Sequence, residues 1–162
     1  MAAEIGEYLV GAYLKLIDGC DFVDYNVRTP GGGLAGLNEL DVVGLHFKTE
    51  TAYLCEVTTH VAGLLYGNKG NAETVERVAK KYERQQAYAT QFLDNFRYHR
   101  FMFWSPVVPR GYMTERLEQI PGLELVINSE YKRRVQILLD KARREKQDPV
   151  FRTFQILGAL RD

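Results

Sequence analysis

The chain has 162 residues, of which 46% are apolar and 26% charged, so it is long enough for one domain with a hydrophobic core and too apolar to be disordered. Its 21 Lys and Arg residues balance its 21 Asp and Glu residues, so the overall charge does not support nucleic-acid binding, although it leaves room for a local basic face. The two cysteines, Cys20 and Cys55, are too few for a disulfide scaffold or a zinc site.

The sequence also lacks the features of secreted and membrane proteins. Its first residues do not form a basic leader followed by an apolar segment, and no apolar run is long enough to cross a bilayer. We therefore expect a cytoplasmic protein that does not engage a membrane.

The first half of the chain predicts one helix followed by three strands. Apolar residues at helical spacing predict an amphipathic helix over 3–18, and an alternating pattern predicts a strand over 22–28. After a glycine-rich loop, apolar segments over 37–47 and 51–59 form a predicted hairpin. Because these strands are close in sequence, we expect them to pair antiparallel.

The second half alternates helices and strands. The pattern predicts a helix over 72–96, a strand over 101–108, a short helix over 112–119, a strand over 123–127, a helix to about 146, and a last helix that begins at Asp148-Pro149. A strand–helix–strand segment fits a parallel crossover. The predicted fold class is therefore α/β, a mixed central sheet flanked by helices. We expect a single domain over 1–162, with a core over about 3–127 and a helical extension over about 128–162.

Two carboxylates lie inside the predicted hairpin, where charge is costly unless something compensates it. Asp41 is in the first strand and Glu56 in the second. An even-numbered turn at 48–51 pairs Phe47 with Ala52, which sets Asp41 opposite Thr58. Asp41 and Glu56 then share one face at a diagonal separation of roughly 7–8 Å.

Two acids at this spacing raise each other's proton affinity, and a divalent cation removes that cost. Oxygen ligands without thiols or clustered histidines suit Mg²⁺ or Mn²⁺, which can polarise a phosphoryl oxygen and activate a water. The alternative is a pair of acids at a sheet edge that form salt bridges with surface lysines or arginines.

The order of elements and three short segments resemble the PD-(D/E)XK nuclease superfamily, which has a restriction-endonuclease-like fold. The segments are EYLVGAYL (7–14), NELD (38–41) and CEVT (55–58), and the resemblance covers about 3–108. It implies an αβββαβ core in which Asp41, Glu56 and the Val57 carbonyl bind the metal. It also implies that Glu7, or Glu4 in its place, supports the metal or its water.

The chain departs from the family pattern at the motif lysine, where it has Thr58. A hydroxyl can hold a water but cannot supply a positive charge to the attacking group or the transition state. Some family members bring the lysine from another element, and we expect Lys81 to do so here, because it flanks the apolar stripe of the predicted helix beside Gln85. Lys69 and Lys80 are the alternatives.

Further substrate contacts are predicted from Gln85 and from Lys69 in the glycine-rich connection. The predicted helix over 129–146 holds seven basic and three acidic residues, among them Arg133 and Arg134. Such a helix could contact phosphates with salt-sensitive affinity. The alternative is a solvated helix face.

Together these features predict a nuclease that uses Mg²⁺ or Mn²⁺ to hydrolyse phosphodiester bonds, with DNA as the expected partner. Because Thr58 replaces the motif lysine, the alternative is a catalytically weak or inactive nuclease-like module that binds nucleic acid or a protein partner. A chain of this size without a separate sequence-reading domain fits a homodimer, or a protein partner that supplies specificity. These expectations rest on fold-level analogy.

Overall fold

The computed structural model describes residues 3–28, 39–62 and 70–142, together with residues 152, 155, 156, 159 and 160. Its elements in chain order are α1 (Ile5–Leu16), β1 (Phe22–Arg28), β2 (Glu39–His46), β3 (Thr51–Val57), α2 (Asn71–Phe92), β4 (Tyr98–Ser105), α3 (Tyr112–Glu118), β5 (Leu123–Ile127) and α4 (Asn128–Ala142). The glycine-rich loop, Lys69 and most of the predicted last helix lie outside the described residues.

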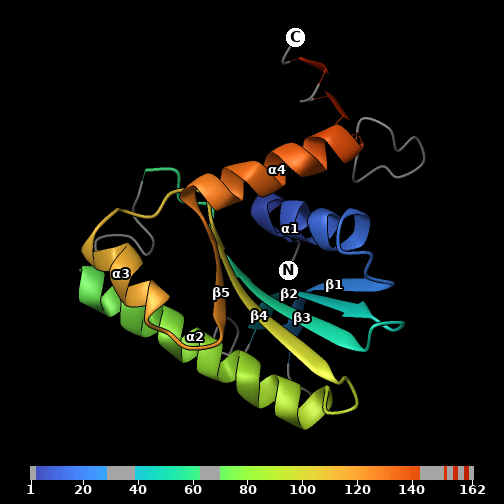
Figure 1. The fold of residues 1–162 in the computed structure, drawn as a ribbon, viewed down its shortest axis with the longest axis horizontal. Coiled ribbons are helices and arrows are strands. Elements are labelled where there is room, and N and C mark those ends of the chain that lie inside the picture. Colours follow the sequence, from blue (N-terminus) through green and yellow to red (C-terminus); the bar gives the residue numbers. More distant parts are fainter. Residues whose placement is uncertain are drawn as a thin grey trace.

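The five strands form one mixed sheet in the order β1-β2-β3-β4-β5. β1, β2 and β3 pair antiparallel, whereas β3, β4 and β5 pair parallel through the crossover helices α2 and α3. Figure 1 shows α1 and α4 on one face of the sheet and α2 and α3 on the other. The prediction of an α/β fold with a mixed central sheet flanked by helices is confirmed.

The central strand β3 is buried on both faces, and each face packs against its own helices. On the first face, Val42, Cys55 and Trp104 pack with residues of α1 and α4, including Leu14 and Leu138. On the second face, Val43, Leu54 and Ala89 form a cluster near the end of α2, and a neighbouring cluster joins α2 to α3. The alternation of side chains along β2 and β3 therefore decides which helix each residue meets.

The predicted register of the β2–β3 hairpin is wrong, because each residue of β3 pairs two positions earlier on β2 than predicted. Leu45 pairs with Ala52 and His46 with Thr51, so the four-residue turn occupies 47–50, and Phe47 does not pair with Ala52. Glu50 completes this turn with a φ of 51°, in the left-handed region. Because the turn still has an even number of residues, the shift of two positions leaves every side chain on its predicted face.

β5 continues directly into α4, so the two elements share a fixed junction. Asn128, the first residue of α4, has a φ of 52°. Its side-chain oxygen accepts a hydrogen bond from the Val108 N–H at 2.8 Å, and its side-chain nitrogen donates to the Val108 carbonyl at 3.1 Å. These bonds tie the start of α4 to the segment that follows β4.

Candidate active site beside the ends of β2 and β3

Asp41 and Glu56 lie at the end of the β2–β3 pair. The last pairs of the antiparallel ladder are Val43 with Leu54 and Val42 with Cys55. Asp41 and Glu56 lie one step beyond these pairs, where the same register would set them opposite each other with Cβ atoms about 4.5–5.5 Å apart. Both acids share the face of Val43 and Leu54, which packs against α2. The structure therefore brings the two predicted acids together more closely than the predicted diagonal.

Asp41 is fixed by the backbone of the neighbouring strand. Its Oδ2 accepts a hydrogen bond from the Val57 N–H at 2.7 Å, beyond the last regular pair of the ladder. Burial raises the pKa of Asp41, whereas Lys81, the Val57 N–H and a hydrogen bond with Glu56 each act to lower it. Two buried carboxylates this close repel each other, so the pair is stabilised by a nearby positive charge.

Lys81 supplies that charge from α2. Its Nζ forms an ion pair with Glu56 Oε1, and the side chains are 22% and 7% exposed. Lys80, by contrast, pairs with Glu76 on the outer surface of α2 at 2.6 Å and its side chain is 62% exposed. Of the three candidate lysines, the structure thus places Lys81 beside the acids and Lys80 away from them, and Lys69 lies outside the described residues.

Glu7 approaches the same end of the sheet from the start of α1. It is buried, and its Oε2 accepts hydrogen bonds from the Glu4 N–H at 2.9 Å and from Asn26 Nδ2 at 3.3 Å. Burial raises the pKa of Glu7, and the nearby charge of Asp41 raises it further. Glu4 forms the reciprocal half of this capping box, so its part in the structure is to start the helix.

Thr58, where the sequence resemblance expects a lysine, forms hydrogen bonds to β4. Its N–H donates to the Trp104 carbonyl at 2.9 Å, and its Oγ1 donates to Ser105 Oγ at 2.9 Å. Both hydroxyl-bearing residues are buried. The hydroxyl of Thr58 is thus part of the β3–β4 contact.

Gln85 is a buried polar residue of α2, one turn after Lys81. It is 1% exposed, and within the described parts of the chain neither its Nε2 nor its Oε1 has a hydrogen-bond partner. Each buried polar group without a partner costs about 1–3 kcal/mol. An apolar side chain of similar length would therefore be more stable at this position.

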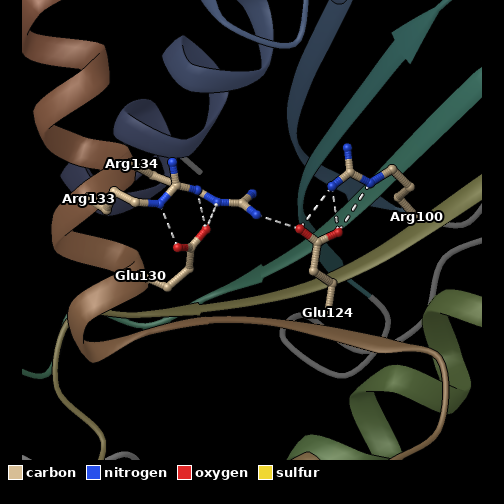
Figure 2. Close-up of polar contacts among 5 residues, drawn as sticks. All are labelled: Arg100, Glu124, Glu130, Arg133 and Arg134. Atoms are coloured by element: carbon tan, nitrogen blue, oxygen red, sulfur yellow. Dashed lines mark hydrogen bonds and ion pairs between the residues drawn. The ribbon is translucent and has the colours of Figure 1, made fainter.

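Arg133 and Arg134 belong to a different cluster on α4. Figure 2 shows a chain of charges in which Arg134 bridges Glu130 and Glu124, Arg100 also pairs with Glu124, and Arg133 pairs with Glu130. α4 and α1 cover the face of the sheet opposite α2, so this network is separate from Asp41 and Glu56. Their predicted contact with substrate stays a prediction.

Within that network, Arg134 packs against aromatic rings of α1 and β4. Its side chain is 11% exposed, and its guanidinium lies 5.5 Å from the ring centre of Tyr13 and 5.3 Å from that of Trp104. Stacked arginines of this kind join helices to the sheet through both packing and charge. Arg133, which is more exposed, is the one of the two that faces solvent.

Two contacts at the site were not anticipated from the sequence. Asn26 has a φ of 51° inside β1 and reaches Glu7, and Ser105 holds the hydroxyl of Thr58. A polar residue in the middle of an alternating strand is a weak signal for the first. For Ser105 the only signal is its place at the end of a strand that is otherwise apolar.

The groups that could hold a cation here are the carboxylates of Asp41 and Glu56 and the carbonyl of Val57. Across residues 3–28, 39–62 and 70–142 and the five separate later ones, no three or more His, Cys, Asp or Glu side chains gather in a group that could hold a metal ion. In the part of the chain that the structure describes, Glu7 therefore interacts with Asp41 through the charge of the two carboxylates and does not join Asp41 and Glu56 in a metal-binding group. Oxygen donors of this kind, with a lysine ammonium beside Glu56 that a divalent cation could replace, fit Mg²⁺ or Mn²⁺.

Among the residues that the structure describes, no helix is both long and apolar enough to cross a membrane. Comparisons with protein-family models, with curated proteins and with solved structures found no match to this chain.

Proposed function

We propose that this chain is a divalent-metal-dependent nuclease of the PD-(D/E)XK type that hydrolyses phosphodiester bonds in DNA. The observation that carries the proposal is the ion pair of Lys81 with Glu56 beside Asp41. It gives an acid–acid–lysine group in a chain whose strand has Thr58 at the lysine position. The order α1-β1-β2-β3-α2-β4 also agrees with the αβββαβ core of the restriction-endonuclease-like fold.

Each residue has a role that its contacts support. Asp41, held by the Val57 N–H, and Glu56 would bind the cation together with the Val57 carbonyl. A bound Mg²⁺ or Mn²⁺ supplies charge for a phosphoryl oxygen and acidity for an attacking water. Lys81 would donate to the phosphate or to that water, and Glu7, hydrogen-bonded by Asn26, would position Asp41.

Metal-dependent cleavage tests this proposal. Supercoiled plasmid, linear duplex and single-stranded DNA are each incubated with Mg²⁺, with Mn²⁺ or with EDTA. We expect the wild type to cut at least one of these substrates only with metal. Asp41→Asn and Glu56→Gln should each lower the rate by about 100-fold or more, because each removes a ligand of the ion.

The matched control is Lys80→Met against Lys81→Met. The two lysines are neighbours in sequence, but only Lys81 pairs with Glu56. We expect Lys81→Met to lose most of the cleavage and Lys80→Met to keep it. Equal cleavage by wild type, Asp41→Asn and Glu56→Gln would show that any activity comes from another site or a contaminant.

The second candidate is a nuclease-like module that binds nucleic acid without cutting it. It is favoured by the bond of Thr58 to Ser105, which takes the hydroxyl at the lysine position out of the site. Such a protein should bind DNA in EDTA, and Asp41→Asn should bind as tightly as the wild type. Absence of cleavage together with this result would replace the first candidate by the second.

A further inference from the structure

The Lys81–Glu56 pair places a cation on the same carboxylate that the proposed function assigns to a metal. Glu56 is 7% exposed, and Lys81 reaches it along a side chain that is 22% exposed. A carboxylate this buried needs a counter-charge, and breaking such a pair leaves an uncompensated charge. In the structure described here that counter-charge comes from α2.

We propose that Lys81 is the resident counter-ion of Glu56 in the metal-free protein, and that a divalent cation displaces it and so frees its ammonium for the substrate phosphate. This inference rests on the proposed function, because it concerns the same two acids. It adds that the metal and Lys81 compete for the carboxylate of Glu56, so that only one of them binds it at a time. The lysine then becomes available only when the metal is in place.

The surroundings allow this exchange without a change of fold. Asp41 is held independently by the Val57 N–H, so the acids keep their backbone positions when Lys81 leaves. A lysine carries its charge on a flexible four-carbon stem and can move it by several ångströms.

The first measurement is Mn²⁺ affinity by isothermal titration calorimetry without nucleic acid. Because Lys81→Met removes the competing cation, we expect this variant to bind Mn²⁺ about tenfold more tightly than the wild type, the size of one close charge pair. Lys80→Met should stay within about twofold of the wild type, because Lys80 pairs with Glu76 away from the acids. Equal or weaker binding by Lys81→Met would overturn the proposal.

The second measurement uses the wild type, so it does not depend on a variant that folds without metal. Lysines are acetylated briefly with and without saturating Mn²⁺, and the modified sites are quantified by mass spectrometry. We expect acetylation of Lys81 to rise several-fold with Mn²⁺ and that of Lys80 to stay constant. Unchanged or lower acetylation of Lys81 at saturating Mn²⁺ would show that the lysine is not displaced.

These outcomes separate the inference from the proposed function. Mn²⁺ binding with no effect at Lys81, in a protein that cleaves DNA, would remove the competition and leave the nuclease. Tighter Mn²⁺ binding by Lys81→Met in a protein that cuts no substrate would keep the competition and remove the nuclease. Absence of Mn²⁺ binding in the wild type and in Lys81→Met would contradict both.

Discussion

Gln85 is a residue whose position conflicts with stability. It occupies a core position of α2 between Tyr82 and Ala89, and within the described chain both ends of its amide lack a partner. Neighbouring Gln86 is exposed and donates to the Tyr82 hydroxyl at 3.0 Å, so the two glutamines differ in burial and bonding. Under the proposed function, this buried amide, one turn from Lys81, would serve the bound substrate.

We predict that Gln85→Met makes the protein more stable and less active. Methionine has a similar length and no polar group, so the free energy of unfolding should rise by about 1–2 kcal/mol. Cleavage should slow by about tenfold or more, as for the loss of a supporting residue near a metal. Urea unfolding and plasmid cleavage measure the two effects, with Gln86→Met as the control. A less stable or fully active Gln85→Met would contradict this role.

At the scale of elements, the site combines a strand pair with the helix that follows it. β2 and β3 supply Asp41 and Glu56, and α2 supplies the cation that a strand lysine supplies in the family pattern. Thr58 lies two residues after Glu56, on the same side of β3. We therefore predict that a lysine at position 58, after β3, can replace the positive charge of Lys81 on α2.

The double substitution Thr58→Lys with Lys81→Met tests this transfer. We expect Lys81→Met alone to lower the cleavage rate by about 100-fold, and the added Thr58→Lys to recover part of it, since a strand lysine would reach the same phosphate. Thr59→Lys in the Lys81→Met background is the control, because Thr59 is exposed and turned to the other side. Wild-type activity in Lys81→Met itself would show that no lysine is needed at this position.

An ion pair between Arg134 and Glu124 joins α4 to the sheet. Glu130, which also pairs with Arg134, makes the stability of the protein depend on pH. Hydrogen bonds from Arg133 and Arg134 lower the pKa of Glu130 to about 2, below its ordinary value of about 4.3. A carboxyl whose folded pKa is depressed contributes stability that is present above the unfolded pKa. That contribution is lost as the pH falls through the window from about 5 to about 2.

Glu130→Gln should therefore be less stable than the wild type at pH 7 and equally stable near pH 2. The difference at pH 7 should be below about 1 kcal/mol, because the pair with Arg133 is partly exposed and screened. Urea unfolding at a series of pH values measures it. A difference that persists or grows toward low pH would contradict the assigned cause.

For the whole molecule, the central sheet separates two charged groups. Asp41, Glu56 and Lys81 lie on the side of α2, and the network of Arg100, Glu124 and Arg134 lies on the side of α1 and α4. Among the described residues, Gln85 near the first group and Trp104 beside the second each have a buried polar atom without a partner, and the arginines of the second group are paired with carboxylates. The proposed function places its chemistry on the α2 side, and the ion pairs of the second group join α4 to the sheet.

Much of this architecture could be predicted from the sequence, because local patterns mark it. Strands 22–28 and 123–127 are predicted to the residue, since alternation and turn residues define both ends. The shared face of Asp41 and Glu56 follows from the parity of the turn alone. Their direct pairing does not, because turns at 47–50 and 48–51 fit the pattern equally and only hydrogen bonding decides between them.

The contacts between distant elements were the least predictable. Helical spacing put Lys81 at the edge of the buried stripe, but the choice of Lys81 over Lys80 needed the packing of α2 on β3. The bond of Asn26 to Glu7 and that of Ser105 to Thr58 join residues far apart in the chain. No local pattern encodes such pairs, because they depend on how complete elements pack.

The most direct test of the central claim, that the two sheet acids jointly bind a hard cation, is the anomalous scattering of Mn²⁺ in crystals grown with the metal. The account predicts one strong anomalous peak beside the carboxylates of Asp41 and Glu56 and the carbonyl of Val57, which is lost in Asp41→Asn crystals grown in the same way. Crystals at saturating Mn²⁺ with no peak beside these two acids, or with a peak that persists in Asp41→Asn, would contradict it.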